Sequence, residues 1–348
     1  MRSGVAEQAH RVPAPRGHAE PAQRERPQRR LDGERDGERR EVAGQWRAVA
    51  EVAAYVAVAA LLATRAPLMA SVVGLMVLGI LHNVLELRYV LARWRGAFTG
   101  WFAVAVLALV TVIALTRLAG PAGRRVEVVA GFGVLAAGLA RGARTRPVLA
   151  AAGLPMVAVA GALAWTHLDL YFVTVTYLHN LVPFAVLWDW SARLRDAPRR
   201  AFRLVNGAWL LVVPALLLGG LLPVPSPAAQ AGAVRFAGPL AAHVATATPP
   251  AWRGAAAGRF LVVFAFLQVL HYVFWCVFLP RRAAVPQPRL RAAGWAATAA
   301  VAGIFAFGYA TAWSGTRIAY TSLASYHAYV EYAVLALVVL RTPRKAPA

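Results

Sequence analysis

The chain has 348 residues, of which 59% are hydrophobic and only 15% charged, and its mean hydropathy is +0.53. This composition excludes an ordinary soluble domain and indicates an integral membrane protein. The net charge of +22 is typical of nucleic-acid binding, but the arginines stand in short clusters between apolar stretches, so we expect membrane lipids and no nucleic acid as partners.

Residues 1–45 form an N-terminal tail rich in Arg, Glu, Pro and Gly, with the near-repeat DGERDGERR at residues 32–40. The tail lacks the apolar core of a signal peptide. Its composition predicts a disordered cytoplasmic segment with at most a weak attraction to anionic headgroups. The alternative is a start codon placed too early, so that these residues are not part of the protein.

Apolar stretches fill the segment at residues 46–345, which we predict to be a transmembrane helical domain. A helix needs about 20 residues to cross roughly 30 Å of hydrocarbon. The sequence therefore predicts an all-α, multi-pass helix bundle in the cell membrane, with about ten spans, of which the fourth is the shortest. The expected spans lie at residues 47–65, 68–91, 97–117, 126–140, 147–165, 167–190, 201–222, 258–280, 292–313 and 318–340.

The distribution of basic residues predicts the orientation of these spans. Alternating ten spans from a cytoplasmic N-terminus places eighteen Arg and Lys residues on the cytoplasmic side and eight on the other. Cytoplasmic loops are enriched in Lys and Arg, so both termini are expected in the cytoplasm.

One long external connection, residues 223–257, joins the seventh and eighth spans and is rich in Pro, Ala and Gly. We interpret it as a plain connector, with a lid or an interfacial segment as the alternative.

The single cysteine, Cys276, excludes a disulfide framework.

Four histidines are placed deep inside the predicted spans, where polar side chains are costly and need a partner. They occupy the second, sixth, eighth and tenth spans, which all run inward. Counting from the outer ends puts them about 9 to 14 residues down, or roughly 14 to 21 Å, so we expect them at nearly one depth. The four are His82, His179, His271 and His327.

Two carboxylates accompany the histidines at helical spacing. Glu86 follows His82 by four residues, and Glu331 follows His327 by four, which places each pair on one helix face. Such pairs suit two ligands of one ion, or a carboxylate that holds the far ring nitrogen of a ligand. We therefore predict a metal site, with a proton or ion pathway and plain structural contacts as alternatives. Its residues are His82, His179, His271, His327, Glu86 and Glu331.

The segment GILHNVLE at residues 79–86 resembles a conserved stretch of the Brp/Blh-type membrane β-carotene dioxygenases, and YFVTVTYLHN at residues 171–180 is similar to their aromatic, histidine-bearing helix. The resemblance implies an iron ligand at His82, with Glu86 in place of the family's aspartate. Leu81 and Asn83 replace a proline and a glycine of that stretch, and Pro183 stands where the family has a second histidine.

These observations favour a metal-dependent oxygenase that acts on a lipid or isoprenoid, with iron as the expected cofactor and zinc as an alternative. Histidines on separate spans also suit a b-type haem in an electron-transfer protein. A proton-coupled transporter would use the same cluster as a relay. For the first of these functions we expect a hydrophobic small-molecule substrate as a partner.

Overall fold

The structure, a computed structural model, describes residues 22–225, 230–282 and 291–340, and all regular elements in these ranges are helices. The chain divides into two units, residues 1–48 and 49–348. The first unit contains the beginning of the long helix α1 (Ala22–Arg65). All sites discussed below belong to the second unit.

Helix α1 begins within the tail that composition predicts as disordered. From Ala22 onward the described tail is helical, and residues 1–21 lie outside the described ranges. Arg, Glu, Gln and Ala have high helix propensity, and the Gln45 amide donates to the Glu41 carboxylate one turn away at 3.2 Å. Local propensity and such contacts favour a helix without any hydrophobic burial.

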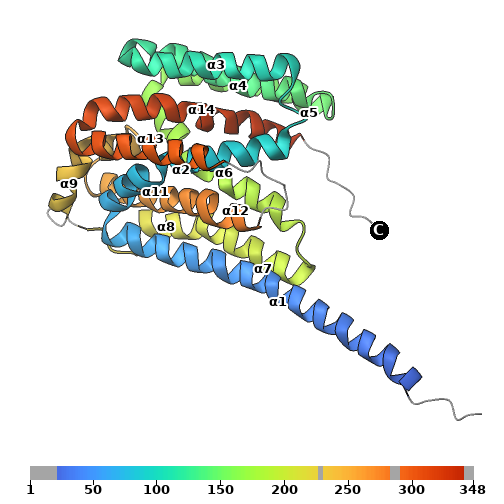
Figure 1. Ribbon diagram of the computed structural model, residues 1–348. Coiled ribbons are helices and arrows are strands. Elements are labelled where there is room, and N and C mark those ends of the chain that lie inside the picture. Colours follow the sequence, from blue (N-terminus) through green and yellow to red (C-terminus); the bar gives the residue numbers. More distant parts are fainter. Residues whose placement is uncertain (1–21, 226–229, 283–290, 341–348) are drawn as a thin grey trace, which may run out of the picture. The chain divides into compact units, whose positions relative to one another are not determined.

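The second unit continues with helices, most of them long, that lie side by side (Figure 1). Their ranges are α2 (Pro67–Trp94), α3 (Gly100–Leu118), α4 (Arg124–Gly142), α5 (Pro147–Thr166), α6 (Leu168–Ser191), α7 (Asp196–Gly207), α8 (Val213–Leu218), α11 (Ala255–Val273), α12 (Leu279–Arg282), α13 (Ala292–Thr311) and α14 (Trp313–Val339). Short π-helical turns at Ala208–Val212 and Phe274–Phe278 join α7 to α8 and α11 to α12. The prediction of an all-α polytopic bundle is confirmed.

Nine helices of the described ranges are long and apolar enough to cross a membrane. They coincide with nine of the ten predicted spans. The fourth predicted span, α4, is a helix of 19 residues that packs against α3, α5 and α14, but it is not among the nine, because charged residues at both ends shorten its apolar part. Those residues are Arg124, Arg125, Glu127 and Arg141.

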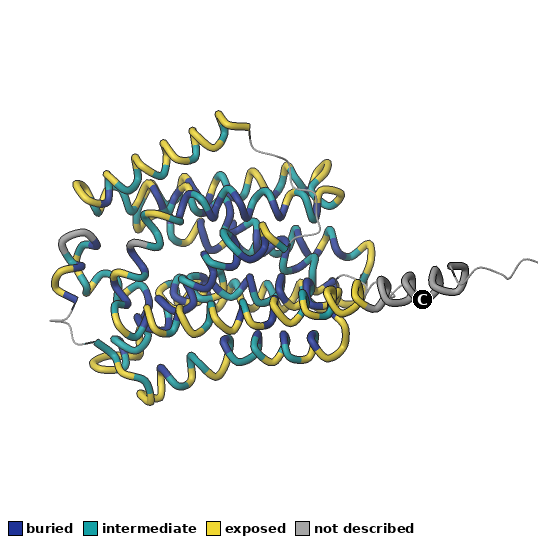
Figure 2. Tube along the Cα trace, turned by 60° about the horizontal axis from the view of Figure 1, so that its bottom comes forward, coloured by how far each residue is buried: buried dark blue, intermediate teal, exposed yellow. Residues whose placement is uncertain are grey.

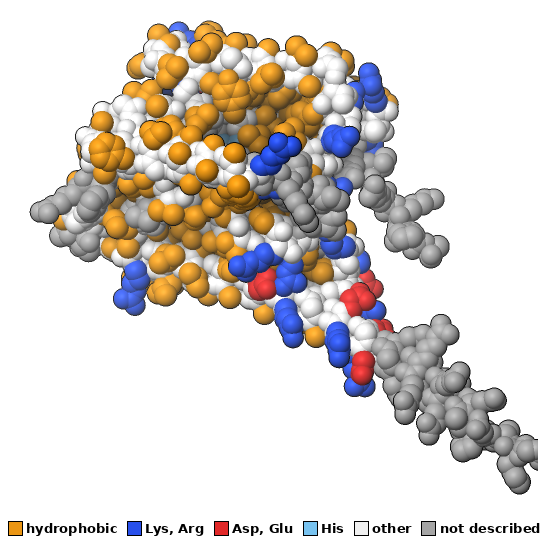
Figure 3. Space-filling model, in the orientation of Figure 1, with side chains coloured by type: hydrophobic (Ala, Val, Ile, Leu, Met, Phe, Trp, Pro, Cys, Tyr) orange, Lys and Arg blue, Asp and Glu red, His pale blue; other side chains and the backbone are white. Residues whose placement is uncertain are grey.

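Large apolar side chains are exposed along the outer helices, as expected for a surface that faces lipid. Examples are Leu107 on α3, Met156 on α5 and Phe307 on α13. Hydrophobic side chains also cover much of the face shown in Figure 3. The bundle is therefore suited to a membrane.

Four helices form the interior of the bundle. In each candidate span, the most apolar stretch of 18 residues can be compared for burial. Between 44% and 67% of this stretch is buried in α2, α6, α14 and the α11–α12 segment, whereas 28% or less is buried in the other five spans. Figure 2 shows buried residues gathered in the middle of the bundle. These four elements carry the four histidines predicted to form a site.

The predicted connector at residues 223–257 contains two short helices, α9 (Ala231–Ala237) and α10 (Leu240–Ala247), and residues 226–229 lie outside the described ranges. Ala233 and Ala237 pack against Leu68 of α2. The Tyr177 hydroxyl of α6 donates to the carbonyl of Ala247 at 2.8 Å. The connector is therefore folded onto the bundle.

Candidate metal centre

All six residues of the predicted site meet in the interior of the bundle. His82 and Glu86 come from α2, His179 from α6, His271 from α11, and His327 and Glu331 from α14. Five of these side chains are at most 2% exposed, and His179 retains 18%. The shared depth of the histidines thus corresponds to shared space.

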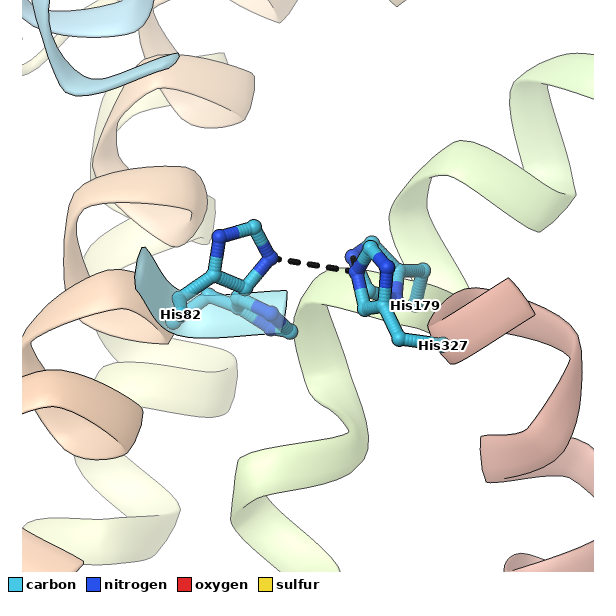
Figure 4. Close-up of side chains that lie close together, drawn as sticks. His82, His179 and His327 are labelled. Atoms are coloured by element: carbon cyan, nitrogen blue, oxygen red, sulfur yellow. Dashed lines mark hydrogen bonds between the residues drawn. The ribbon is translucent and has the colours of Figure 1, made fainter. Parts of the chain in front are cut away.

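Three imidazoles converge through the same ring atom. Nε2 of His327 lies 3.1 Å from Nε2 of His82 and 3.3 Å from Nε2 of His179. Figure 4 shows these three rings facing one another. Two nitrogen ligands of one tetrahedral zinc-type ion, each about 2.0 to 2.1 Å from the metal, stand about 3.3 Å apart, so this spacing is compatible with a common ion.

The partners of the far ring nitrogens determine which atoms carry lone pairs. Nδ1 of His82 lies 3.2 Å from the carbonyl of Leu78, and Nδ1 of His179 lies 2.6 Å from Oε2 of Glu331. A carbonyl or a carboxylate accepts a hydrogen bond, so both contacts favour a proton on Nδ1. The Nε2 lone pairs of these two histidines are then directed toward Nε2 of His327, which has one hydrogen at most to share between them.

The fourth histidine and the second carboxylate complete the cluster. The ring of His271 lies 4.3 Å from that of His179 and 5.2 Å from that of His82, centroid to centroid. One ligand atom from each of the four histidines can be chosen so that all lie within 4.8 Å of one another. Oε2 of Glu86 lies 3.7 Å from Nε2 of His271.

The carboxylates contact histidines of neighbouring helices rather than those of their own. The i,i+4 spacing predicts Glu331 beside His327 and Glu86 beside His82, and each pair does share a helix face. The close contacts nevertheless run from Glu331 to His179 and from Glu86 to His271. Side chains on converging faces reach across the interface, and sequence spacing within one helix carries no information about that contact.

Several polar atoms of the cluster have no hydrogen-bond partner although they are fully buried. An unpaired polar group in an apolar interior costs roughly 1 to 3 kcal/mol, and an ionised one costs more. An unfilled ion site is one of the explanations for such atoms. They are both oxygens of Glu86, both ring nitrogens of His271, Nδ1 of His327 and Oε1 of Glu331. Polar groups approach them without forming a well-aligned donor–acceptor pair: the Glu86 and Glu331 carboxyl groups approach each other, and the carbonyls of His179 and Ala324 approach the rings of His271 and His327.

Local backbone features lie beside the ligating positions. Pro183 stands four residues after His179 within α6, and because proline has no N–H, the carbonyl of His179 loses its helical hydrogen bond. Three residues after His271 the chain enters the π-helical turn Phe274–Phe278. Such irregular turns inside helices are frequent at functional sites.

Aromatic side chains border the cluster. The ring of Tyr272 lies 4.6 Å from that of His82, and its hydroxyl accepts a hydrogen bond from the Gln268 amide at 2.9 Å. The hydroxyl of Tyr320 would lie 2.6 Å from a Cβ added at Gly79. The absence of a side chain at Gly79 therefore leaves room for the Tyr320 ring against α2.

A second buried polar group, which the sequence does not predict, ties α3, α4 and α14 together. Glu127 accepts from the Arg117 guanidinium at 2.6 Å and from the Tyr329 hydroxyl at 2.7 Å. The Tyr329 hydroxyl also lies 3.2 Å from that of Tyr171. The position of Arg117 and Glu127 on either side of one short connection is the signal that indicates this pair.

Two other histidines lie apart from the cluster. His167 is exposed at the junction of α5 and α6. His243 of α10 donates from Nε2 to the carbonyl of Ala237 at 2.6 Å, and its ring lies 5.5 Å from that of Trp313, centroid to centroid, at an interplanar angle of 59°. Neither of them is a predicted metal ligand.

Comparisons with protein families, with characterised proteins and with solved structures found no match to this chain. The function is therefore inferred from the chemistry of the cluster.

Proposed function

We propose that this membrane protein binds a metal ion through its histidine cluster and acts as a metal-dependent oxygenase. His82, His179 and His327 would bind through Nε2, with His271 as the fourth ligand. The observation that carries the proposal is the convergence of three Nε2 atoms at 3.1 and 3.3 Å while two of the rings hold their Nδ1 protons elsewhere. Metal-binding histidines are commonly fixed in this way.

The two carboxylates match the charge of a divalent cation. Glu86 and Glu331 are fully buried beside the histidines, and two ionised carboxylates together would balance two positive charges. A buried charge is stable only when it is paired, so the ion and the carboxylates would stabilise each other. Four neutral imidazoles alone would leave a divalent ion uncompensated.

Imidazole ligands with nearby carboxylates suit both iron and zinc. Of the two we favour iron, because the segment at residues 79–86 resembles an iron-dependent family. A bound iron ion would supply the activation of molecular oxygen. The protein's contribution would be to hold the ligands, to exclude bulk water and to position the substrate.

A lipid or isoprenoid substrate is supported by the location of the centre. His179 lies near the middle of α6, and its side chain is the one in the cluster with appreciable exposure, at 18%. At this depth the neighbouring medium would be hydrocarbon. A molecule dissolved in the membrane could therefore approach the cluster, and bordering aromatic rings such as Tyr272 would provide apolar contacts.

The arrangement of the rings favours a single ion over a haem. A porphyrin with two axial histidines needs an open plane between them. Here His82, His179 and His327 face one another directly, and the ring of His271 packs against that of His179. The proposal therefore predicts an absorption spectrum without a Soret band.

Elemental analysis of the full chain, purified in detergent and loaded anaerobically with Fe(II), tests the proposal. We expect bound iron in stoichiometric amounts, and a loss of most of it in His82→Ala and His327→Ala. His167→Ala is the matched control, since it removes an exposed histidine outside the cluster, and it should retain the metal.

Nitric oxide provides the test of oxygen reactivity. If the iron has an open coordination position, nitric oxide should give the EPR signal of a high-spin iron–nitrosyl species in the wild type and not in His82→Ala. A folded wild-type chain that binds no transition metal would refute the proposal and favour proton transport instead, whereas a Soret band would favour electron transfer.

A further inference from the structure

The geometry points to a second metal site beside the first, formed by Glu86, His271 and Glu331. One ligand atom from each of these residues lies within 4.8 Å of the others. The inference extends the proposed function, because it replaces a single ion by a pair. His82, His179 and His327 would bind one ion, and the second group would bind the other.

Glu86 is the residue to which a single ion on four histidines would give charge balance but no bond. Its side chain is 0% exposed, and no N–H or O–H of another residue donates to its carboxylate oxygens. The group within hydrogen-bonding reach of them is the carboxyl group of Glu331, and two ionised carboxylates repel each other unless a cation lies between them. An ion bound to four histidine nitrogens gives these oxygens no bond. A carboxylate in this position is costly unless a cation lies against it.

Glu331 has one oxygen for each group. Oε2 accepts from Nδ1 of His179 at 2.6 Å and so orients a ligand of the first ion. Oε1 is buried without a partner. One carboxylate would thus support the first ion through a histidine and bind the second ion directly.

His271 belongs to both possible ligand groups. Both of its ring nitrogens are buried without a well-aligned hydrogen bond. The carbonyl of His179 is the acceptor near this ring, so one nitrogen can hold its proton there while the other binds an ion. Nε2 of His271 lies 3.7 Å from Oε2 of Glu86. Two ligands of one ion, at about 2.0 to 2.2 Å each, lie at most about 4.4 Å apart, so this pair fits one metal.

The ligand types indicate the kind of ion. Three imidazoles suit iron, zinc or copper, whereas two carboxylates and one imidazole favour iron or manganese among divalent transition metals. Paired ions in proteins stand about 3.5 to 4 Å apart. Because His271 adjoins the rings of His82 and His179, the two groups lie close enough for such a pair.

The number of ions per chain tests this inference. We expect elemental analysis of monodisperse, Fe(II)-loaded protein to give two ions per wild-type chain and one in Glu86→Gln. The control is Glu127→Gln, the same change at a buried carboxylate that pairs with Arg117 outside the cluster, and it should keep two ions.

A measurement on the wild type alone guards against a Glu86→Gln chain that does not fold. After loading with Mn(II), two ions at this separation should give a spin-coupled EPR spectrum. The spectrum of an isolated ion, or one metal per folded chain, would overturn the second site and leave the proposed function intact. Two ions retained in folded Glu86→Gln would overturn the ligand assignment, and a wild type without metal would refute both proposals.

Discussion

Gly131 of α4 is the residue at which close packing around the buried Glu127 group is most restrictive. A Cβ added there would lie 2.6 Å from the Tyr171 hydroxyl and 2.7 Å from Cε1 of Tyr329. Both tyrosines are buried and hydrogen-bonded to each other, so they have little freedom to move. We expect Gly131→Ala to lower the free energy of unfolding by about 1 to 3 kcal/mol, as overpacking commonly does.

The matched control is Gly133→Ala, two residues further along the same helix. A Cβ at Gly133 would lie 3.3 Å from the end of the flexible Leu109 side chain. Alanine is favoured over glycine inside a helix by up to about 1 kcal/mol, so this variant should be neutral or stabilised. Thermal unfolding in detergent measures both variants, and equal melting temperatures would contradict the argument from Gly131.

At the residue scale, the six cluster positions could be predicted because polar side chains are rare inside apolar spans and helical spacing pairs two carboxylates with two histidines. The contacts from Glu331 to His179 and from Glu86 to His271 could not. They depend on how the faces of different helices meet. The same limit applies to Glu127, which the sequence places at a span end and the structure buries against Tyr329.

At the scale of elements, the docking of α10 should depend on pH through His243. This histidine lies in the connector between candidate spans, and burial lowers its pKa below 6.5, although the Ala237 carbonyl acts in the opposite direction; the charge of Arg317 lowers it further. Because the folded form disfavours the protonated ring, its contribution to stability is present above pH 6.5 and is lost as the pH falls.

We therefore expect the protection of the α10 amides against hydrogen exchange, measured relative to the intrinsic exchange rate at each pH, to fall when the pH is lowered from about 8 to 5. His243→Gln retains a side-chain N–H donor and does not titrate, so its protection relative to the intrinsic rate should vary less over the same range. Identical pH dependence in both proteins would show that another group controls the segment.

The connector and the tail also show where composition is insufficient to predict elements. Pro, Ala and Gly between residues 223 and 257 indicate a plain connector, yet α9 forms where the small side chains of Ala233 and Ala237 fit closely against α2. Helix α10 is held by the hydrogen bond from the Tyr177 hydroxyl to the Ala247 carbonyl. The ten predicted helices, in contrast, were recognisable from apolar length, since every one of those stretches is helical.

At the scale of the whole molecule, each helix that crosses the membrane changes the side on which the following connections lie. Whether α4 crosses therefore determines the side of every connection after it. It is not sufficiently apolar to rank with the nine candidate spans. It nevertheless has 19 residues and packs along α3 and α14, and at 1.5 Å per residue it is about 28 Å long. The charge of Glu127 at its start is compensated by Arg117.

We predict that α4 crosses the membrane, so that the connections before and after it lie on opposite sides. If it did not cross, the five arginines between residues 193 and 203 would be placed outside the cell, against the preference of Arg for cytoplasmic loops. Single cysteines introduced as Ala122→Cys and Arg144→Cys, in a Cys276→Ser background, can be tested with a membrane-impermeant thiol reagent on intact cells. Labelling at position 122 alone is expected, whereas labelling at both positions or at neither would mean that α4 does not cross and that the two ends of the chain lie on opposite sides.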